Sequence, residues 1–224
     1  MAGTETIIEP LVRSDTPVAL VGGGFVGSDD LDWAMSRARL LVAADGGAET
    51  IVANGYSPDV VIGDMDSVDP AVLEQIEANR LHHVSEQDTT DFEKCLQRIA
   101  APGVVALGCL GKRLDHSLAT LAVTARTGTP CLLIGPQDVA FVAPARLVLD
   151  LPSDCRVSLF PLAPVTGRSR GLRWPIDGLE LSPMGRLGTS NQATGKVFLE
   201  CEGIIVLLPR DMRDAAFEGL FAEN

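Results

Sequence analysis

Residues 40–67 read LLVAADGGAETIVANGYSPDVVIGDMDS, and this stretch decides how the first half of the chain folds. Its apolar runs at 40–44 and 59–62 have the length and composition of buried strands. A short helical segment at 48–53 separates them, which predicts two parallel strands joined by a crossover helix. Because parallel strands point their carboxyl ends to one edge of a sheet, the acidic residues after the two runs are expected to meet there.

The same alternation of apolar runs and helical segments continues on both sides of this stretch. Asp69 is a predicted N-cap with Pro70 at the first helical position, and either Thr89 or Thr90 opens a later helix. The pattern predicts an α/β fold, with a parallel-sheet domain over residues 16–140 and a loose leader before Asp15. The other predicted strands lie at 17–21, 81–84, 104–107 and 131–134, and the other predicted helices at 29–38, 70–79, 90–100 and 115–126.

Residues 141–224 follow a different pattern. Prolines and glycines become frequent after Gly135, and short runs alternate apolar and polar residues with the period of a β-strand. We predict a smaller all-β sandwich domain here. Its predicted strands lie at 146–149, 156–160, 196–200 and 204–208, with a short helix near 212–217.

Composition narrows the class of protein. The chain has 18 basic and 30 acidic residues, a net charge of −12, which disfavours nucleic acid or an anionic membrane as a partner. No apolar run approaches the roughly 18 residues of a membrane-spanning helix, and we expect no signal peptide at the N-terminus. The five cysteines are scattered and odd in number, as in reduced proteins of the cytoplasm, which is the expected location.

Three acidic clusters follow successive predicted strands. They contain Asp45, the pair Asp64 and Asp66, and Asp91. One such cluster is also typical of a solvated turn. Asp91 alone suits the first turn of a helix, where it can pair with Lys94, three residues on, at the helix surface. Three clusters at one sheet edge repel each other unless a cation lies among them, and Mg²⁺ is the usual cation where phosphates are bound. Asp64, Asp66 and Asp91 are the predicted metal ligands, with Asp45 close by.

Two further segments predict contacts to phosphate groups. Gly23 and Gly24 follow the first strand, where they allow a nucleotide to approach the backbone, although a plain tight turn explains them equally well. No P-loop motif occurs in the sequence. Arg113 belongs to the only basic pair at the acidic edge, so it is the predicted phosphate partner. Asp115 and His116 are candidates for nucleotide binding, or for a helix cap and an ordinary first-turn residue.

Six segments in this order resemble the signature motifs of the thiamine pyrophosphokinase family, over about residues 18–208. Departures are small, and none removes a proposed ligand: Met65 stands where Phe is usual, Glu86 where Asp is usual, and Lys112 where Gly is common. The segments are ADGGA at 44–48, GDMDS at 63–67, EQDTTDFEK at 86–94, GCLGKRLDH at 108–116, GLRWP at 171–175 and SN at 190–191.

The resemblance implies transfer of a pyrophosphoryl group from ATP to the hydroxyethyl oxygen of thiamine, with Mg²⁺ as cofactor. It also implies an α/β domain, a β-sandwich domain and a homodimer that binds thiamine where the subunits meet. The expected catalytic residues are Asp45, Asp64, Asp66, Asp91 and Arg113. The expected thiamine contacts are Gln87, which has no capping duty that the sequence reveals, and Trp174, Ser190 and Asn191.

Other functions stay open on the sequence alone. A metal-dependent phosphohydrolase also uses paired aspartates, but the Ser67-Val68 pair fits its expected motif poorly. A related pyrophosphokinase acting on a pterin alcohol differs only in its acceptor. A regulator that binds nucleotide or thiamine without turnover has no need of all three acidic clusters.

Overall fold

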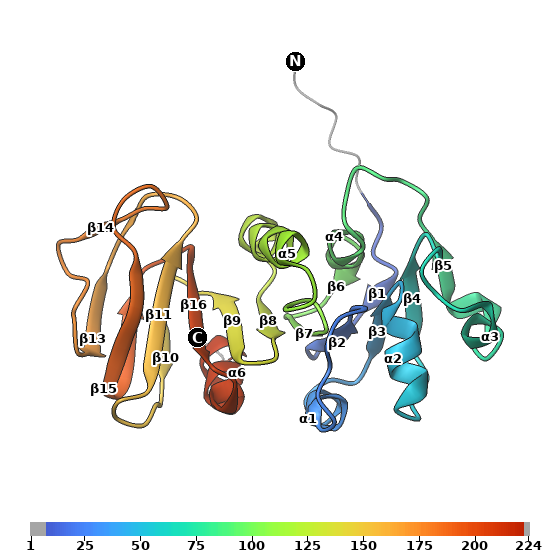
Figure 1. The fold of residues 1–224 in the computed structure, drawn as a ribbon, viewed down its shortest axis with the longest axis horizontal. Coiled ribbons are helices and arrows are strands. Elements are labelled where there is room, and N and C mark those ends of the chain that lie inside the picture. The colour runs from blue at the N-terminus through green and yellow to red at the C-terminus, as the bar shows by residue number, and fades with distance from the viewer. Residues whose placement is uncertain (1–7, 222–224) are drawn as a thin grey trace, which may run out of the picture.

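A twelve-stranded sheet runs the length of the molecule (Figure 1). The structure, a computed structural model, describes residues 8–221. Six neighbouring strands at one end are parallel, in the spatial order β8-β7-β2-β3-β4-β5, which confirms the predicted α/β class. Their bounds are β2 (Val18–Val21), β3 (Leu41–Ala44), β4 (Val60–Gly63), β5 (Leu81–His83), β7 (Val104–Leu107) and β8 (Cys131–Ile134).

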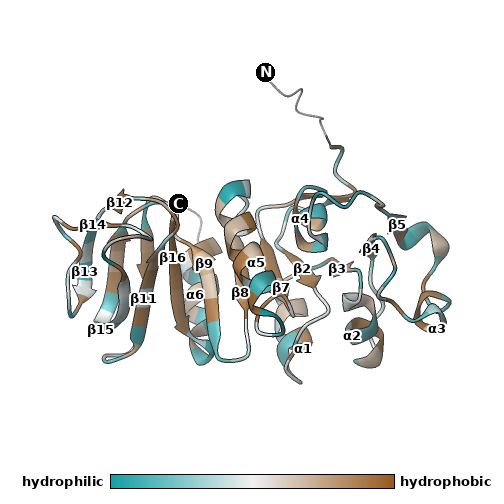
Figure 2. Ribbon diagram, turned by 45° about the horizontal axis from the view of Figure 1, so that its top comes forward, coloured by the Kyte–Doolittle hydropathy of each residue, from teal (hydrophilic) through white to brown (hydrophobic). Residues whose placement is uncertain are grey.

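Helices cover both faces of the parallel strands. In β3, Leu41 and Ala43 pack into one apolar layer, while Val42 and Ala44 pack into the other. Figure 1 shows two pairs of helices on opposite sides, and Figure 2 shows apolar strands between them. Within residues 8–221, no helix combines the length and hydropathy needed to cross a bilayer. The first layer holds α1 (Asp30–Met35) and α2 (Gly47–Ala53), and the second holds α4 (Asp91–Leu96) and α5 (Leu114–Thr127).

The helix after β4 is shorter than predicted. Asp69 caps α3 (Pro70–Leu73) as expected, because its side chain accepts a hydrogen bond from Ala71 N at 2.8 Å. However, α3 ends after one turn. Ile76 then buries its side chain, and the 3₁₀ turn η1 (Ala78–Arg80) leads into β5. Burial of Ile76 therefore outweighs the helical propensity of the segment.

The prediction of a loose leader before Asp15 is wrong for its last residues. β1 (Val12–Arg13) pairs in parallel with β6 (Ile99–Ala100), and Val12 is only 3% exposed. The same pairing shortens the helix predicted to reach residue 100, which ends at Leu96 after being capped by Thr90. Residues 1–7 of the predicted leader lie outside the described residues.

The second half continues the sheet with antiparallel strands. β9 pairs with both β8 and β16, and the predicted boundary at 140/141 falls inside β9. β15 has 13 residues; one part pairs with β11 and another with β10 and β13. The predicted strands of this half are confirmed, while its sandwich arrangement and the domain limits stay predictions. The strands are β9 (Asp138–Val142), β10 (Leu147–Leu149), β11 (Arg156–Pro161), β12 (Val165–Thr166), β13 (Arg168–Leu172), β14 (Glu180–Leu181), β15 (Gly188–Glu200) and β16 (Ile204–Pro209).

The last helix returns to the first half of the chain. α6 (Arg213–Phe221) follows the 3₁₀ turn η2 (Arg210–Met212), in the region predicted to be helical. Trp33 of α1 donates from Nε1 to Asp214 Oδ1 at 2.8 Å, and its ring meets Phe217 edge-on with centroids 6.0 Å apart. These contacts fasten the C-terminal segment to α1.

The pairing of β1 generates a stability test. Val12→Ala is expected to lower the free energy of unfolding by about 2 kcal/mol, because it removes buried apolar surface. Leu11→Ala is the matched control: Leu11 is 40% exposed, and its truncation is expected to cost about 0.5 kcal/mol. Urea unfolding measures both. Equal losses for the two variants would show that β1 does not pack as described.

Candidate active site

A cleft of about 580 Å³ lies at the carboxyl edge of the parallel strands. Its walls come from the loops after β2, β3, β4 and β7 and from the start of α4, so the strand order itself gathers them. Most residues predicted for the site from the first half of the chain lie in this one cleft. They are Gly23, Gly24, Asp45, Asp64, Gln87, Asp91, Arg113 and His116.

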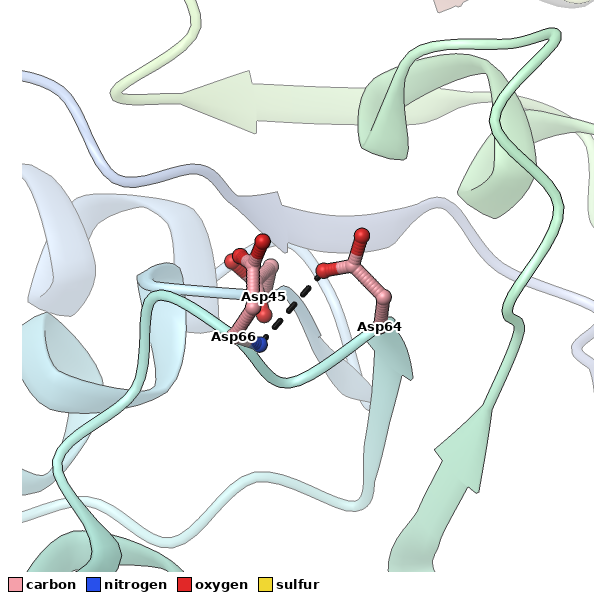
Figure 3. A group of neighbouring side chains, drawn as sticks. All are labelled: Asp45, Asp64 and Asp66. Atoms are coloured by element: carbon pink, nitrogen blue, oxygen red, sulfur yellow. Dashed lines mark hydrogen bonds between the residues drawn. The ribbon is translucent and has the colours of Figure 1, made fainter.

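Three carboxylates come together in this region (Figure 3). Asp45 follows β3 and Asp64 follows the adjacent β4, while Asp66 lies two residues further on. Each of the three offers an oxygen, and these atoms lie within 4.8 Å of one another. The loop is tightened by a bond from Asp66 N to Asp64 Oδ1 at 3.5 Å. The structure thus gathers Asp45, rather than Asp91, with the predicted ligands Asp64 and Asp66.

The backbone around these carboxylates is strained. Asp45 has φ 44° and Met65 has φ 63°, and both values lie in the left-handed region that residues other than glycine rarely adopt. Each such residue costs of order 1–3 kcal/mol and persists only where its surroundings dictate it. A Cβ added to Gly63 would lie 2.8 Å from Asp45 Cβ, so close packing with β4 holds Asp45 in place.

Asp45 is the most buried of the three carboxylates. The residue is 4% exposed, and its Oδ1 has no hydrogen-bond partner among the described residues. Burial raises the pKa of Asp45, and the negative charges of Asp91 and Asp64 raise it further. An unpartnered carboxylate oxygen beside two other carboxylates is an all-oxygen donor set, which fits a hard divalent cation such as Mg²⁺.

Lys94 is a site residue that sequence reasoning missed. The sequence suggested a surface pair with Asp91, but Lys94 is 2% exposed and its Nζ lies 3.0 Å from Asp91 Oδ1. Burial is the largest single influence on the pKa of Lys94, and burial alone would lower that pKa. The hydrogen bond and negative charge of Asp91, together with the charges of Asp64 and Glu86, outweigh burial, so the pKa of Lys94 is raised. Lys94 is therefore a fixed cation in the wall of the cleft.

Gln87 and Arg113, both predicted to contact a ligand, form hydrogen bonds with carboxylates of the protein itself. Gln87 Nε2 donates to Asp64 Oδ2 at 2.8 Å, so its amide is bound to a predicted metal ligand; its contact to thiamine stays a prediction. This bond is the main reason that the pKa of Asp64 is lowered. Arg113 forms a two-point pair with Asp115, with Nε to Oδ1 at 3.1 Å and Nη2 to Oδ2 at 2.5 Å. Lys112 Nζ instead reaches across the cleft and donates to the carbonyl of Gly23 at 3.1 Å.

The predicted thiamine contacts in the second half lie away from the cleft. None of Trp174, Ser190 and Asn191 lines it, and Figure 1 places β13 and β15 at the opposite end of the sheet from β3 and β4. The buried amide of Asn191 is used internally: Oδ1 accepts from Trp174 N at 3.1 Å and Nδ2 donates to Trp174 O at 2.7 Å. Trp174 is 53% exposed, so it is not a core residue. Asn191 fixes the backbone of an exposed tryptophan.

An α/β fold with an acidic cleft at the carboxyl ends of its strands is typical of enzymes that bind phosphorylated ligands with a divalent cation. Residues 31–132 match the family model described as the catalytic domain of thiamin pyrophosphokinase. Thiamine pyrophosphokinase 1 of Oryza sativa subsp. japonica is 30% identical over 190 residues, which cover 69% of this chain and 72% of the relative. The chain belongs to the thiamine pyrophosphokinase family.

Other relatives and solved structures agree. Thiamin pyrophosphokinase 1 of Caenorhabditis elegans is 25% identical, and the match covers 76% of this chain and 79% of the relative. The thiamin pyrophosphokinase of Geobacillus thermodenitrificans superposes with a TM-score of 0.73 at 23% identity, over 86% of this chain and 96% of that one. The yeast enzyme superposes with a TM-score of 0.69 at 18% identity, over 93% of each chain. At these identities the structures show a shared fold.

The carboxylate cluster generates a test of metal binding. Mg²⁺ is expected to raise the melting temperature at neutral pH, with a stabilisation of about 2.7 kcal/mol at a hundred times its dissociation constant. Asp66→Asn is expected to remove most of this shift. Asp88→Asn is the matched control, because Asp88 is exposed, as Asp66 is, but does not belong to the carboxylate cluster. Equal shifts for the two variants, measured by thermal denaturation with and without Mg²⁺, would contradict the assignment.

Proposed function

We propose that this protein transfers the pyrophosphoryl group of ATP to the hydroxyethyl oxygen of thiamine, giving thiamine diphosphate and AMP. Family membership supports the reaction. The observation that carries its chemistry is the grouping of Asp45, Asp64 and Asp66, of which Asp45 and Asp64 line the cleft. Carboxylates in this number, beside a glycine-lined wall, suit a cation that is shared with phosphate oxygens.

Asp64 and Asp66, together with Asp45, would hold the Mg²⁺, and Asp91 is the next carboxylate in the cleft. When bound, the ion would neutralise charge on the triphosphate. Lys94 contributes a positive charge that does not depend on the ion, because it is fixed by Asp91 and protonated. Asp91 therefore serves the site by orienting Lys94, whether or not it also contacts the metal.

In this proposal the nucleotide binds against the wall of the cleft that is formed by Gly23, Gly24 and the start of α5. A Cβ on Gly24 would lie 2.4 Å from the carbonyl oxygen of Gly108, so two backbone loops meet there without side chains. Phosphate groups can approach such a surface closely. Arg113, with Asp115 and His116 nearby, provides the cationic rim; Arg113 exchanges its contact with Asp115 for a phosphate when ATP binds.

Thiamine lies between two subunits of a homodimer in this proposal. Trp174 is exposed and is bonded to Asn191 of β15, which lies at the far end of the sheet from β3 and β4. A site that uses both Trp174 and the acidic cleft therefore needs a second copy of the chain. The exposed indole face and the acidic cleft both suit the positive thiazolium ring. Gln87 and Ser190 would contact the aminopyrimidine, and Asn191 would hold Trp174 in place.

The rival functions differ in their acceptor. A pyrophosphokinase acting on a pterin alcohol would share the cleft, and a phosphohydrolase would use water. A flat aromatic residue with a buried amide behind it supports thiamine, since a planar cation stacks well on indole. All five cysteines are unpaired, which supports a reducing compartment, and we propose the cytoplasm.

An assay tests the reaction directly. With ATP, Mg²⁺ and thiamine, the protein is expected to form AMP and thiamine diphosphate in equal amounts, and to form no AMP without an acceptor alcohol. Asp64→Asn is expected to lower kcat about 10²-fold or more, while the fold persists. Asp88→Asn is the control and should retain activity. Formation of AMP from ATP with water alone would favour the hydrolase.

Mixed subunits test the composite site. Asp66→Asn disables the acidic half and Trp174→Ala the aromatic half; Trp174 is exposed, so its loss should leave the fold intact. Neither variant alone should be active. A heterodimer has one site that is built from the two unmutated halves, so about half of the normal activity per such dimer is expected. Confirmed heterodimers without regained activity would mean that each site is built within one chain.

A further inference from the structure

Asp30 is a buried carboxylate outside the cleft. It is the first residue of α1 and is 1% exposed. Its Oδ1 lies 3.1 Å from Arg213 Nη1 and also forms an ion pair with Arg210. Its Oδ2 accepts a hydrogen bond from Gly27 N at 2.7 Å. Asp30 thus lies between two arginines of the C-terminal segment and the end of residues 22–27, called here the glycine loop.

Arg210 connects two loops at the carboxyl edge of the sheet. Besides Asp30, its guanidinium donates to the carbonyl oxygen of Gly135, directly after β8, and its backbone N donates to Gln137 O at 3.0 Å. A Cβ on Gly27 would lie 2.6 Å from Arg210 Nη2. The glycine loop therefore packs against this guanidinium with no room for a side chain between them.

The other end of the glycine loop forms part of the cleft wall. Its first three residues line the cleft, and Gly24 N donates to Gly108 O at 2.8 Å. Only two residues separate Gly24 from Gly27. Gly27 donates a hydrogen bond to Asp30 and lies directly against the guanidinium of Arg210. Because the segment is so short, displacement of Gly27 moves the backbone that faces the cleft.

We propose that Arg210 is a positioning residue for the nucleotide: through Asp30 and Gly135 it fixes the glycine loop in the conformation that binds ATP. The proposal rests on the proposed function, in which that loop faces the triphosphate. It gives the C-terminal segment a role in the nucleotide site of its own chain, separate from any contact across a dimer. A displacement of about 1 Å in the backbone that contacts a ligand is enough to weaken its binding substantially.

Arg210→Met tests the proposal. Arg213 still pairs with Asp30 in this variant, so the buried carboxylate keeps a cationic partner. The dissociation constant of ATP with Mg²⁺, measured by calorimetry without thiamine, is expected to rise about tenfold. The KM for ATP should rise in parallel, while kcat and the KM for thiamine change less than about twofold.

Arg37→Met is the matched control. Arg37 also ties the α1 segment to α6, through Asp214 at 2.5 Å and through the ring of Phe217, whose centroid lies 5.5 Å from the guanidinium carbon, and it makes no hydrogen bond to the glycine loop. Its loss should lower stability and leave ATP affinity within about twofold of the parent. This comparison separates positioning of the loop from general loosening of the C-terminal helix.

The outcomes separate this proposal from the proposed function. If the parent protein makes thiamine diphosphate and Arg210→Met binds ATP as tightly as the parent, the positioning role is wrong and the function stands. If the parent neither binds ATP nor turns it over with thiamine, both fail. If Arg210→Met lacks a cooperative urea transition, Gly27→Ala decides: its methyl group would lie 2.6 Å from Arg210 Nη2 and 3.1 Å from Asp30 Oδ2, so Gly27 and these side chains must move apart. Either movement breaks the contact on which the proposal depends, and unchanged ATP affinity overturns it.

Discussion

A carboxylate oxygen of Asp45 is buried without a hydrogen-bond partner among the described residues, and the cleft is arranged around it. Parallel pairing of β3 with β4 places Asp64 beside it, and the left-handed backbone at Asp45 and Met65 turns the loops inward. Such an arrangement is unfavourable in isolation, because burial and like charges both disfavour ionisation. Lys94 offsets part of this repulsion from within the protein, and a divalent cation would remove the rest.

The C-terminal helix packs against the first helix of the chain. The continuous sheet carries the chain from the acidic cleft to the antiparallel strands, and α6 then returns to α1. Arg210 and Arg213 of that returning segment form ion pairs with the buried carboxyl group of Asp30, and removing such partners from a buried pair is strongly destabilising. The glycine loop therefore owes its position to residues about 180 positions away in sequence.

Sequence patterns predicted what depends on local periodicity and strand direction. The parallel strands, the cap at Asp69 and the convergence of Asp64 with Asp66 all follow from short stretches. The pairing of Val12 with Ile99 and the one-turn length of α3 depend on tertiary contacts that no local pattern contains. Lys94 was misjudged for the same reason: spacing from Asp91 indicates a pair, but only the packing of α4 against the sheet shows that the pair points inward.

The side chain of Asn191 fixes the backbone of Trp174. Both ends of its amide are bound to the backbone of Trp174, and Oδ1 also accepts a hydrogen bond from Gln192 N at 2.9 Å. What this part of the surface presents is an indole face, flanked by the guanidinium of Arg173 at 5.0 Å from the ring centroid. Recognition there would rest on stacking and charge more than on directed hydrogen bonds. Arg173 competes for the same face, so a cationic ligand must displace it or use the opposite side of the ring.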